Sequence, residues 1–304
     1  MKVGLIIPTL NAGPQFVELL KSIEMQDLAP HHKLIIDSAS EDATTRTAES
    51  FGYEVISIRR ADFDHGATRN IGLSLPADIE ILVFLTQDVI LANRNSLSNL
   101  LAVFADPQVG AGYGRQLPHL HAGAIAAHAR MFNYREVSYC CDADNARARG
   151  IKAVFMSNSF AAYHRTALEE VGGFPNRVIL GEDTCVAAKM ILSGWKISYS
   201  AEAAAYHSHD YTLWQETRRY FDIGAFHASE SWILGNFGAA GGEGRKYVIS
   251  ELKYLWNTGH YALILCSLMR NAAKLLAYHS GRRHKYFPSA LKRRLSLNKN
   301  FWLE

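Results

Sequence analysis

Apolar and polar residues alternate in two distinct ways along the first third of the chain. Short apolar runs bounded by turn residues predict buried strands, whereas apolar residues recurring every three or four positions predict helices. We expect strands at Val3–Pro8, Lys33–Asp37, Glu54–Ile58 and Ile81–Leu85. Helices are expected between them at Pro14–Met25, Glu41–Phe51 and Ala67–Ser74. This alternation predicts an α/β fold with a mainly parallel sheet flanked by helices.

The pattern changes in the second part of the chain. Gly110, Gly112 and Gly114 alternate with apolar residues, which suits a strand with close backbone approach. A helix is expected at Glu182–Ser193, followed by short strands at Lys196–Tyr199 and Ala203–Tyr206. Beyond Thr212 the pattern is helical at Leu213–Ile233 and Tyr247–Tyr278, separated by the glycine-rich linker GNFGAAGGEG at 235–244. The sequence therefore predicts a C-terminal helical extension.

The charge of the chain is unevenly distributed. Its 304 residues have a net charge of +3, but residues 282–304 carry +6 and the rest −3. A basic tail indicates either a surface partner such as nucleic acid or anionic lipid, or a solvated helix end. The acidic body lacks a basic stripe, so we expect no nucleic-acid partner. The broad apolar band of the last long helix predicts packing on the first domain, a dimer contact or peripheral contact with a membrane surface.

Two further features concern the cellular compartment. No run of 18 uninterrupted apolar residues occurs, so no membrane span is predicted. The four cysteines include an adjacent pair and no C-x-x-C motif, which favours reduced thiols. We therefore expect a cytoplasmic protein, with any membrane contact peripheral and on the inner face of the cytoplasmic membrane.

Polar residues follow the predicted strands at the edge where α/β sheets bind ligands. Thr9 and Asn11 follow the first strand, and the segment 37–42 with Asp37 and Ser40 follows the second. Asp37 is suited to accept hydrogen bonds from a ribose or a base. The fourth strand ends in Thr86, Gln87 and Asp88, and a lone carboxylate there suits Mg²⁺ or Mn²⁺ shared with a nucleotide diphosphate. No G-x-G-x-x-G motif is present, which argues against a dinucleotide-binding oxidoreductase.

Three other motifs carry candidate chemistry. Arg69 lies in the first turns of a helix and is either a diphosphate ligand or a surface residue. Glu182 and Asp183 begin another helix, either as acids favoured by the helix dipole or with a general base among them. His207 and His209 are two apart, so that both can face one site and complete a metal centre with Asp88, or be a surface pair.

The order of these motifs, IIPTLN, IDSASED, GATRN, TQD, GED and YHSH, resembles the inverting glycosyltransferases of family 2, which have the GT-A fold. The resemblance covers residues 1–215, which it implies to be the catalytic domain, with 216–304 as the helical region. DHGATRN, LTQD and YHSHDYT are most similar to the bacterial rhamnosyltransferases that build O-antigen and related surface polysaccharides.

The resemblance implies specific roles and partners. The nucleotide of the donor would be held by Thr9, Asn11, Asp37, Ser40, Arg69 and Gln87. Asp88 would be the remaining acid of the D-x-D metal motif, whose first acid is Thr86 here, and His207 its histidine. Asp183 would be the catalytic base, with Glu182 beside it. His209, on the metal side, and Trp195 are further candidate site residues. The implied cofactor is Mg²⁺ or Mn²⁺, the implied donor dTDP-β-L-rhamnose, and the implied acceptor a lipid-linked glycan.

Three alternatives remain at this point. These alternatives are a non-catalytic sugar-nucleotide-binding subunit, a family 2 transferase that uses another donor sugar, and a nucleotidyltransferase. The intact Glu182–Asp183 pair argues against the first. PTLNAGP has no Lys after the first strand, which argues against the last. Nothing in the sequence chooses the sugar.

Overall fold

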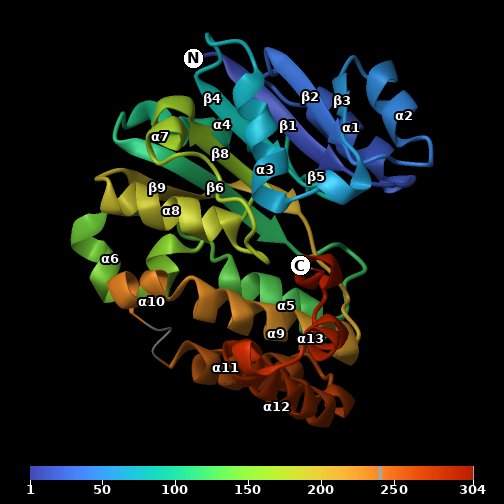
Figure 1. Cartoon of the computed structure of the whole chain (residues 1–304), viewed down its shortest axis with the longest axis vertical. Coiled ribbons are helices and arrows are strands. Elements are labelled where there is room, and N and C mark those ends of the chain that lie inside the picture. Colours follow the sequence, from blue (N-terminus) through green and yellow to red (C-terminus); the bar gives the residue numbers. More distant parts are fainter. Residues whose placement is uncertain (239–241, 304) are drawn as a thin grey trace.

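The computed structural model describes residues 1–238 and 242–303 and has an α/β sheet at its centre (Figure 1). Among the described residues one sheet contains nine strands, in the order β3-β2-β1-β4-β8-β6-β9-β5, with β7 also paired to β9. The strands are β1 (Val3–Thr9), β2 (His32–Asp37), β3 (Glu54–Ser57), β4 (Ile81–Leu85), β5 (Ile90–Leu91), β6 (Val109–Leu117), β7 (Tyr139–Cys141), β8 (Phe160–His164) and β9 (Lys196–Tyr206).

The four strands predicted in the N-terminal part are confirmed, and so is their parallel arrangement. The ladders β1–β2, β1–β4 and β2–β3 are all parallel. Beyond β4 the sheet is mixed, because β8 runs antiparallel to both β4 and β6, whereas β6 and β9 are parallel. The two short strands expected at Lys196–Tyr199 and Ala203–Tyr206 form the single strand β9.

Both faces of the sheet are covered by helices, which is why its strands are apolar on both sides. Alternate residues of β1 and β4 enter two separate clusters, with Leu5 and Val83 on one face and Ile6 and Phe84 on the other. The first face packs against α1 (Gln15–Glu24) and α4 (Ser96–Leu101), and we call this cluster the α1 core. The second packs against α8 (Glu182–Leu192) and is called the α8 core.

Strand β9 changes faces partway along its length. Ser200 pairs with Gly114 of β6, but the next pair is Arg115 with Ala204, so a bulge of three residues, 201–203, interrupts the ladder. Tyr199 lies in the α8 core, whereas Ala203 and Ala205 lie in the α1 core. The bulge therefore reverses the alternation of the strand just before its carboxyl end.

The remaining helices connect the strands or form the C-terminal part. They are α2 (Thr44–Ser50), α3 (His65–Asn70), α5 (Ala124–Asn133), α6 (Ala143–Arg149), α7 (Arg165–Glu170), α9 (Leu213–Ser229), α10 (Ser231–Phe237), α11 (Glu243–Asn257), α12 (Ala262–Arg282) and α13 (Ser289–Leu295). Short 3₁₀ segments lie at Arg60–Asp62, Ile71–Ser74, Ala102–Ala105, Gly150–Val154, His284–Tyr286 and Lys299–Trp302.

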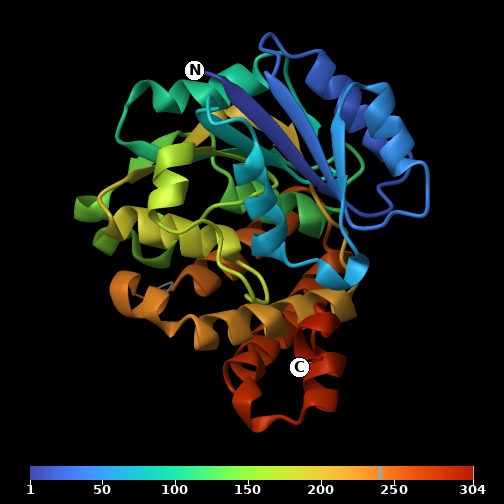
Figure 2. The ribbon, with the colours of Figure 1, turned by 45° about the horizontal axis from the view of Figure 1, so that its top comes forward.

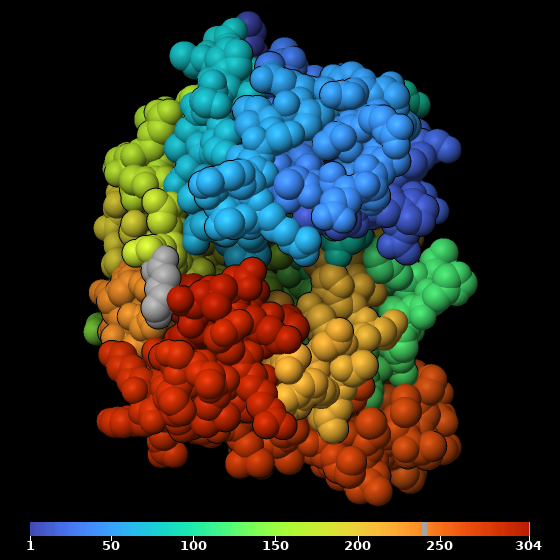
Figure 3. All heavy atoms as spheres, turned by 45° about the vertical axis from the view of Figure 1, so that its right-hand side comes forward, coloured from blue at the N-terminus to red at the C-terminus, as the bar shows by residue number. Residues whose placement is uncertain are grey.

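The C-terminal helices lie below the sheet in Figures 1 and 2 and form a continuous block in Figure 3. The two predicted helical stretches each contain two helices, α9 with α10 and α11 with α12. Of the predicted glycine-rich linker at 235–244, residues 239–241 lie outside the described part of the chain. The predicted domain boundary at residue 215 falls in the first turn of α9, whose Phe221 and Phe226 pack in the α8 core.

Helices α9 and α12 approach each other through glycine. A Cβ on Gly281 would lie 2.0 Å from the carbonyl oxygen of Phe221, and one on Gly224 would lie 2.1 Å from that of Tyr278. Such distances require direct backbone contact between the two helices. Within the described residues, no helix combines the length and apolar character needed to cross a membrane.

We predict that Gly281→Ala destabilises the protein by about 1–3 kcal/mol, because the added methyl group has to push apart two helix backbones. Thermal or urea unfolding measures the effect. Gly235→Ala in α10 is the matched control, since no atom lies within 4 Å of its added Cβ and alanine favours the helix. Equal stability of the two variants would contradict the close contact of α9 with α12.

Candidate active site

The predicted nucleotide-site residues at the ends of β1, β2 and β4 lie together. The Asp37 carboxylate accepts hydrogen bonds from the Thr9 hydroxyl at 2.8 Å, and from the backbone N–H and hydroxyl of Ser40 at 2.8 and 2.6 Å. The backbone N–H of Asn11, at a φ of 45°, donates to Ser40 Oγ. Asp37 is buried, so these contacts fix the two strand ends relative to each other.

Gln87 connects the end of β4 to the same loop. Its side-chain oxygen accepts from the backbone N–H of Leu10 at 2.7 Å, and its nitrogen donates to the Leu10 carbonyl at 3.2 Å. The residue that follows, Asp88, therefore has a fixed position relative to Thr9 and Asn11. Five predicted residues, Thr9, Asn11, Asp37, Ser40 and Gln87, thus belong to one cluster of loops.

Asp88, His207 and His209 form a group that can hold a metal ion. One ligand atom of each lies within 4.8 Å of the others. The Nε2 atoms of His207 and His209 are 3.4 and 3.6 Å from Asp88 Oδ2. Both histidines lie just beyond the end of β9, and their convergence on Asp88 agrees with the prediction made from their spacing.

The hydrogen-bond partners of His207 orient its ring as a metal ligand requires. Gln116 directs its nitrogen to Ser157 Oγ at 2.8 Å, so its oxygen accepts the Nδ1–H of His207 at 2.9 Å and a guanidinium N–H of Arg130 at 2.6 Å. This hydrogen bond leaves the Nε2 lone pair of His207 free toward Asp88, as a metal requires. One carboxylate and two imidazoles are a suitable donor set for a divalent ion.

Electrostatics around the group also favour a cation. Burial opposes ionisation of Asp88, but His207 and His209 in their protonated forms, together with a hydrogen bond from Thr86, hold the pKa of Asp88 below the ordinary value. Burial, with the neighbouring His207, lowers the pKa of His209 to about 4. At neutral pH, an ionised carboxylate therefore lies beside a His209 ring whose nitrogen can accept a metal.

Glu182 and Asp183 begin α8 directly after Gly181, whose φ of 79° turns the chain into the helix. Glu182 is buried, pairs with the Arg69 guanidinium at 3.1 Å and accepts a hydrogen bond from the Asn158 side chain at 3.0 Å. Arg69 also donates to the carbonyl oxygen of His65 at 2.8 Å. The structure therefore places Arg69, predicted as a diphosphate ligand, in a buried pair with Glu182.

Asp183 has different partners. Its Oδ2 accepts the backbone N–H of Asn158 at 3.1 Å and its Oδ1 that of Thr184 at 2.7 Å. The Thr184 hydroxyl also donates to Oδ1, at 3.4 Å. These donors fix the orientation of the carboxylate, while Oδ2 keeps a second lone pair for another proton or donor.

The two adjacent carboxyls differ in their pKa values. Burial and the negative charge of Glu182 raise the pKa of Asp183 to about 7. Burial opposes ionisation of Glu182 as well, but the Arg69 guanidinium holds its pKa below the ordinary value. Environments that separate the pKa values of neighbouring acids are typical of acid–base sites, and Asp183 is the member able to exchange a proton near neutral pH.

The segment 157–159 connects the acid pair to the metal group. Ser157 bonds Gln116, which holds His207, while the next residue, Asn158, bonds both Glu182 and Asp183. The carbonyl of Ser159 accepts the N–H of Thr86 at the end of β4. Asp88 and Asp183 therefore lie at the same end of the sheet, as predicted.

Four residues of this region were not predicted as site residues from the sequence: Gln116, Arg130, Asn158 and Arg219. Gln116 lies near the carboxyl end of β6, a position that would have been recognised had the full length of this strand been predicted. Arg219 of α9 lies over the Tyr211 ring at 5.9 Å, and its charge contributes to lowering the pKa of both His65 and His209. Its contact with Tyr211 places it near His209, because the Tyr211 ring lies 5.2 Å from the His209 ring.

Trp195 does not join the site. It precedes Lys196, the first residue of β9, whereas His207 follows the last. Its ring stacks on His164 and its indole N–H donates to Glu170 at 3.0 Å. The expectation for Trp195 is wrong because this residue lies at the opposite end of the strand.

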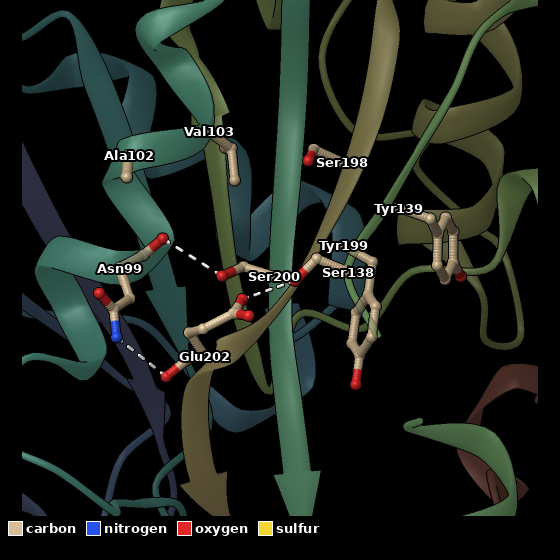
Figure 4. A pocket seen from close by; sticks show the side chains of 9 residues that line it. All are labelled: Asn99, Ala102, Val103, Ser138, Tyr139, Ser198, Tyr199, Ser200 and Glu202. Atoms are coloured by element: carbon tan, nitrogen blue, oxygen red, sulfur yellow. Dashed lines mark hydrogen bonds between the residues drawn. The ribbon is translucent and has the colours of Figure 1, made fainter. Parts of the chain in front are cut away.

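A separate hollow lies beside the bulge of β9 (Figure 4). Its lining comes from α4 and the following turn, from β7 and from β9, and includes Asn99, Ser138, Ser200 and Glu202. Ser138 donates to the Glu202 carboxylate at 2.6 Å. None of the predicted site residues lines this hollow.

An α/β sheet with polar strand ends, beside a group able to hold a divalent metal and an acid pair, is the arrangement expected of a GT-A sugar transferase. A family model described as Glycosyl transferase family 2 matches residues 5–172. The chain belongs to this family and is a glycosyltransferase. The predicted fold class and family are confirmed.

Two curated relatives match almost the whole chain. The O-antigen chain rhamnosyltransferase RfbN of Salmonella typhimurium is 44% identical over 99% of this chain and 96% of its own length. The O-antigen chain rhamnosyltransferase WbaN of Salmonella anatum is 44% identical over 98% of this chain and 95% of its own. The predicted similarity to the rhamnosyltransferase branch is confirmed.

Two solved structures show the same fold. The mannosyltransferase PcManGT of Pyrobaculum calidifontis, in complex with GDP-Man and Mn²⁺, has a TM-score of 0.60 and 20% identity over 97% of this chain and 84% of that one. Residues 1–349 of TarS from S. aureus have a TM-score of 0.57 and 16% identity over 94% of this chain and 91% of that one.

We predict that Glu182→Gln shifts the acid limb of the kcat/KM profile to lower pH by about one unit. The substitution removes the negative neighbour that raises the pKa of Asp183 and leaves Arg69 uncompensated, and both changes favour the ionised form. Initial rates across the pH range measure the shift, with exposed Glu49→Gln in α2 as the control. An acid limb that stays in place would rule out Asp183 as the group titrating there.

Proposed function

We propose that this glycosyltransferase transfers L-rhamnose from dTDP-β-L-rhamnose, with inversion, to a hydroxyl of a growing lipid-linked glycan. The observation that carries the proposal is the single hydrogen-bonded segment, 157–159, that holds the base Asp183 and the metal group Asp88–His207–His209 at one end of the sheet. The choice of rhamnose and of an O-antigen acceptor is supported by the names of the two relatives at 44% identity.

The nucleotide would occupy the loop cluster at the ends of β1, β2 and β4. Thr9, Asn11, Asp37, Ser40 and Gln87 shape this edge, which is where α/β sheets bind nucleotides. Arg219 offers a cation near the metal group, and its contact with a ring in place of a carboxylate leaves its N–H groups available to an anion.

Asp88, His207 and His209 would hold the metal. Two imidazole nitrogens favour Mn²⁺ over Mg²⁺, because Mg²⁺ takes oxygen ligands almost exclusively. When bound, such an ion neutralises charge that develops on a diphosphate leaving group. The support for Mn²⁺ from another protein is the Mn²⁺ in the PcManGT complex.

Asp183 acts as the base in the transfer. Its carboxylate takes the proton of the acceptor hydroxyl, whose oxygen forms a bond to the anomeric carbon from the side opposite the nucleotide. The bond from that carbon to the diphosphate breaks, and its electron pair leaves with dTDP. With a pKa of about 7, Asp183 is about half ionised at neutral pH, and its carboxylate is a stronger base than that of an ordinary Asp. A single displacement inverts the anomeric configuration.

We predict that Asp183→Asn lowers kcat by at least about a hundredfold, because the amide cannot accept the proton. Donor affinity should change little, since the site of the base is separate from the loop cluster. The measurement is steady-state release of dTDP together with donor binding by calorimetry. Turnover close to that of the unmodified protein would remove Asp183 from the base role.

We predict that Asp88→Ala weakens binding of Mn²⁺ and, in the presence of Mn²⁺, binding of the donor by at least about tenfold, because the ion loses its charged ligand. Calorimetry with and without Mn²⁺ measures both. Asp78→Ala is the matched control, since Asp78 is an exposed carboxylate that forms an ion pair with Lys2. If the two variants bind Mn²⁺ equally, the metal group is misplaced.

The decisive experiment for the function is a screen of nucleotide sugars. Release of the nucleoside diphosphate is measured for each donor with a simple rhamnoside acceptor, in the presence of Mn²⁺. We expect dTDP-β-L-rhamnose to be preferred. Faster turnover of another sugar nucleotide would overturn the rhamnose assignment while leaving the transferase mechanism in place.

A further inference from the structure

Helix α12 exposes large apolar side chains and turns charged side chains toward the protein, the reverse of an ordinary surface helix. Two of its charged residues, Lys274 and Arg270, face the protein and pair with Glu216 of α9 at 3.1 and 3.2 Å. Its large apolar side chains face outward, and Leu265 and Leu276 are 68% and 70% exposed. Surface helices normally show the reverse arrangement.

The outward apolar residues form one continuous stripe. At 100° per residue, the exposed side chains of Tyr261, Leu265, Leu268, Met269, Leu275 and Leu276 share one side of α12. Ser267 and Lys274 are buried on the other side. We call these six residues the apolar stripe.

Two features fix the stripe in its outward position. Gly281 and Gly224 bring the backbones of α12 and α9 into contact, so a large side chain has no room between them. Beneath α12, the buried carboxylate of Glu251 in α11 accepts hydrogen bonds from Ser267, from Asn271 and from the hydroxyl of Tyr247. Turning the leucines inward would break this network and leave Glu251 buried without partners, which is strongly unfavourable.

The charges around the stripe indicate what covers it. Residues 243–304 contain twelve Lys and Arg and three acidic residues, and of the basic ones only Arg270 and Lys274 pair inward with Glu216 among the ion pairs described above. Of those acids, Glu251 is fully buried, and Glu243 pairs with Lys152 and Lys246. Exposed Arg283 continues the line of the stripe past the end of α12, and exposed Lys253 lies on neighbouring α11. Two copies of this surface would repel each other, whereas anionic headgroups would complement it.

Aromatic residues mark the end of the same surface. Trp256, at the end of α11, and Tyr261, just before α12, contact each other edge to face with their ring centroids 5.0 Å apart. Both are more than half exposed. Tryptophan and tyrosine of this kind favour the boundary between lipid headgroups and acyl chains.

We propose that the apolar stripe, with Trp256, Lys253 and Arg283, docks on the surface of an anionic phospholipid bilayer, with α12 lying in its plane. The lower edge of the molecule in Figure 1, where α11 and α12 lie, then faces the lipid. A helix with an apolar face and basic flanks binds bilayers by partial burial of that face and by attraction to anionic lipid.

Docking in this way brings the metal group close to the lipid surface. From the inner face of α12, Arg270 donates to the carbonyl of Tyr211 at 3.0 Å, and the Tyr211 ring lies 5.2 Å from that of His209. About one helix diameter, on the order of 10 Å, thus separates the stripe from the loop of His209. The orientation suits an acceptor anchored in lipid, and only this last step rests on the proposed function.

Vesicle co-sedimentation of the full chain tests the docking. The probes are vesicles of phosphatidylcholine and vesicles in which part of it is replaced by phosphatidylglycerol. We expect binding to the anionic vesicles, weakened by added salt, and a loss of at least about tenfold in Leu265→Ser/Leu276→Ser. Met25→Ser/Leu192→Ser removes two similarly exposed apolar side chains from α1 and α8 and should bind as the unmodified protein does.

Three outcomes would overturn the proposal: no binding of the unmodified chain to anionic vesicles, equal losses in both double variants, or equal binding of the unmodified chain and the stripe variant. A dimer in analytical ultracentrifugation that Leu265→Ser/Leu276→Ser dissociates, with vesicle binding unchanged, would assign the stripe to a second copy. Release of dTDP with a water-soluble acceptor should be unaffected by the stripe variant. That readout separates failure of the docking from failure of the proposed function.

Discussion

The chemistry of this site depends on one buried ion pair, that of Arg69 with Glu182. Two adjacent carboxyls at the start of α8 would repel each other if both were ionised without compensation. Because the guanidinium of Arg69 lies against Glu182, this acid stays ionised, and its charge raises the pKa of Asp183. The position of Arg69 thereby decides which of the two neighbouring carboxyls keeps a low pKa and which has a raised one.

A second constraint is positional. The base and the metal group come from distant parts of the chain, yet Ser157 and Asn158 are consecutive and each anchors one of them. A shift of this short segment would move both groups together. The distance between them would then change less than the position of either group in the protein. Gln87 has a similar role, because its one side-chain amide bonds both backbone groups of Leu10 and so connects the loop after β4 to the loop after β1.

Much of this arrangement was predictable from the sequence, for identifiable reasons. Asp37 and Asp88 were found because they lie at or just beyond the ends of apolar strands in the regular N-terminal half, where the periodicity is clear. His207 and His209 were found by their spacing.

Gln116 and Asn158 were missed because they belong to the antiparallel part of the sheet, whose strands have no regular alternation with helices. Trp195 was misplaced because a single strand, β9, joins two predicted pieces, and sequence alone does not show which end of it faces the site. The pairing of Arg69 with Glu182 was not foreseeable, because the two residues are 113 positions apart and only the packing of their helices brings them together. The sequence around Arg69 fits a diphosphate ligand equally well.

The bulge at 201–203 has a consequence for the metal group that lies beyond it. Side chains of a strand point to alternate faces, so an insertion of an odd number of residues exchanges the faces for everything downstream. Without these three positions, the histidines would approach the sheet from the side of the α8 core, away from Asp88. The number of residues in β9 therefore fixes the side from which both histidines approach Asp88, and removal of one residue from the bulge would turn both of them away.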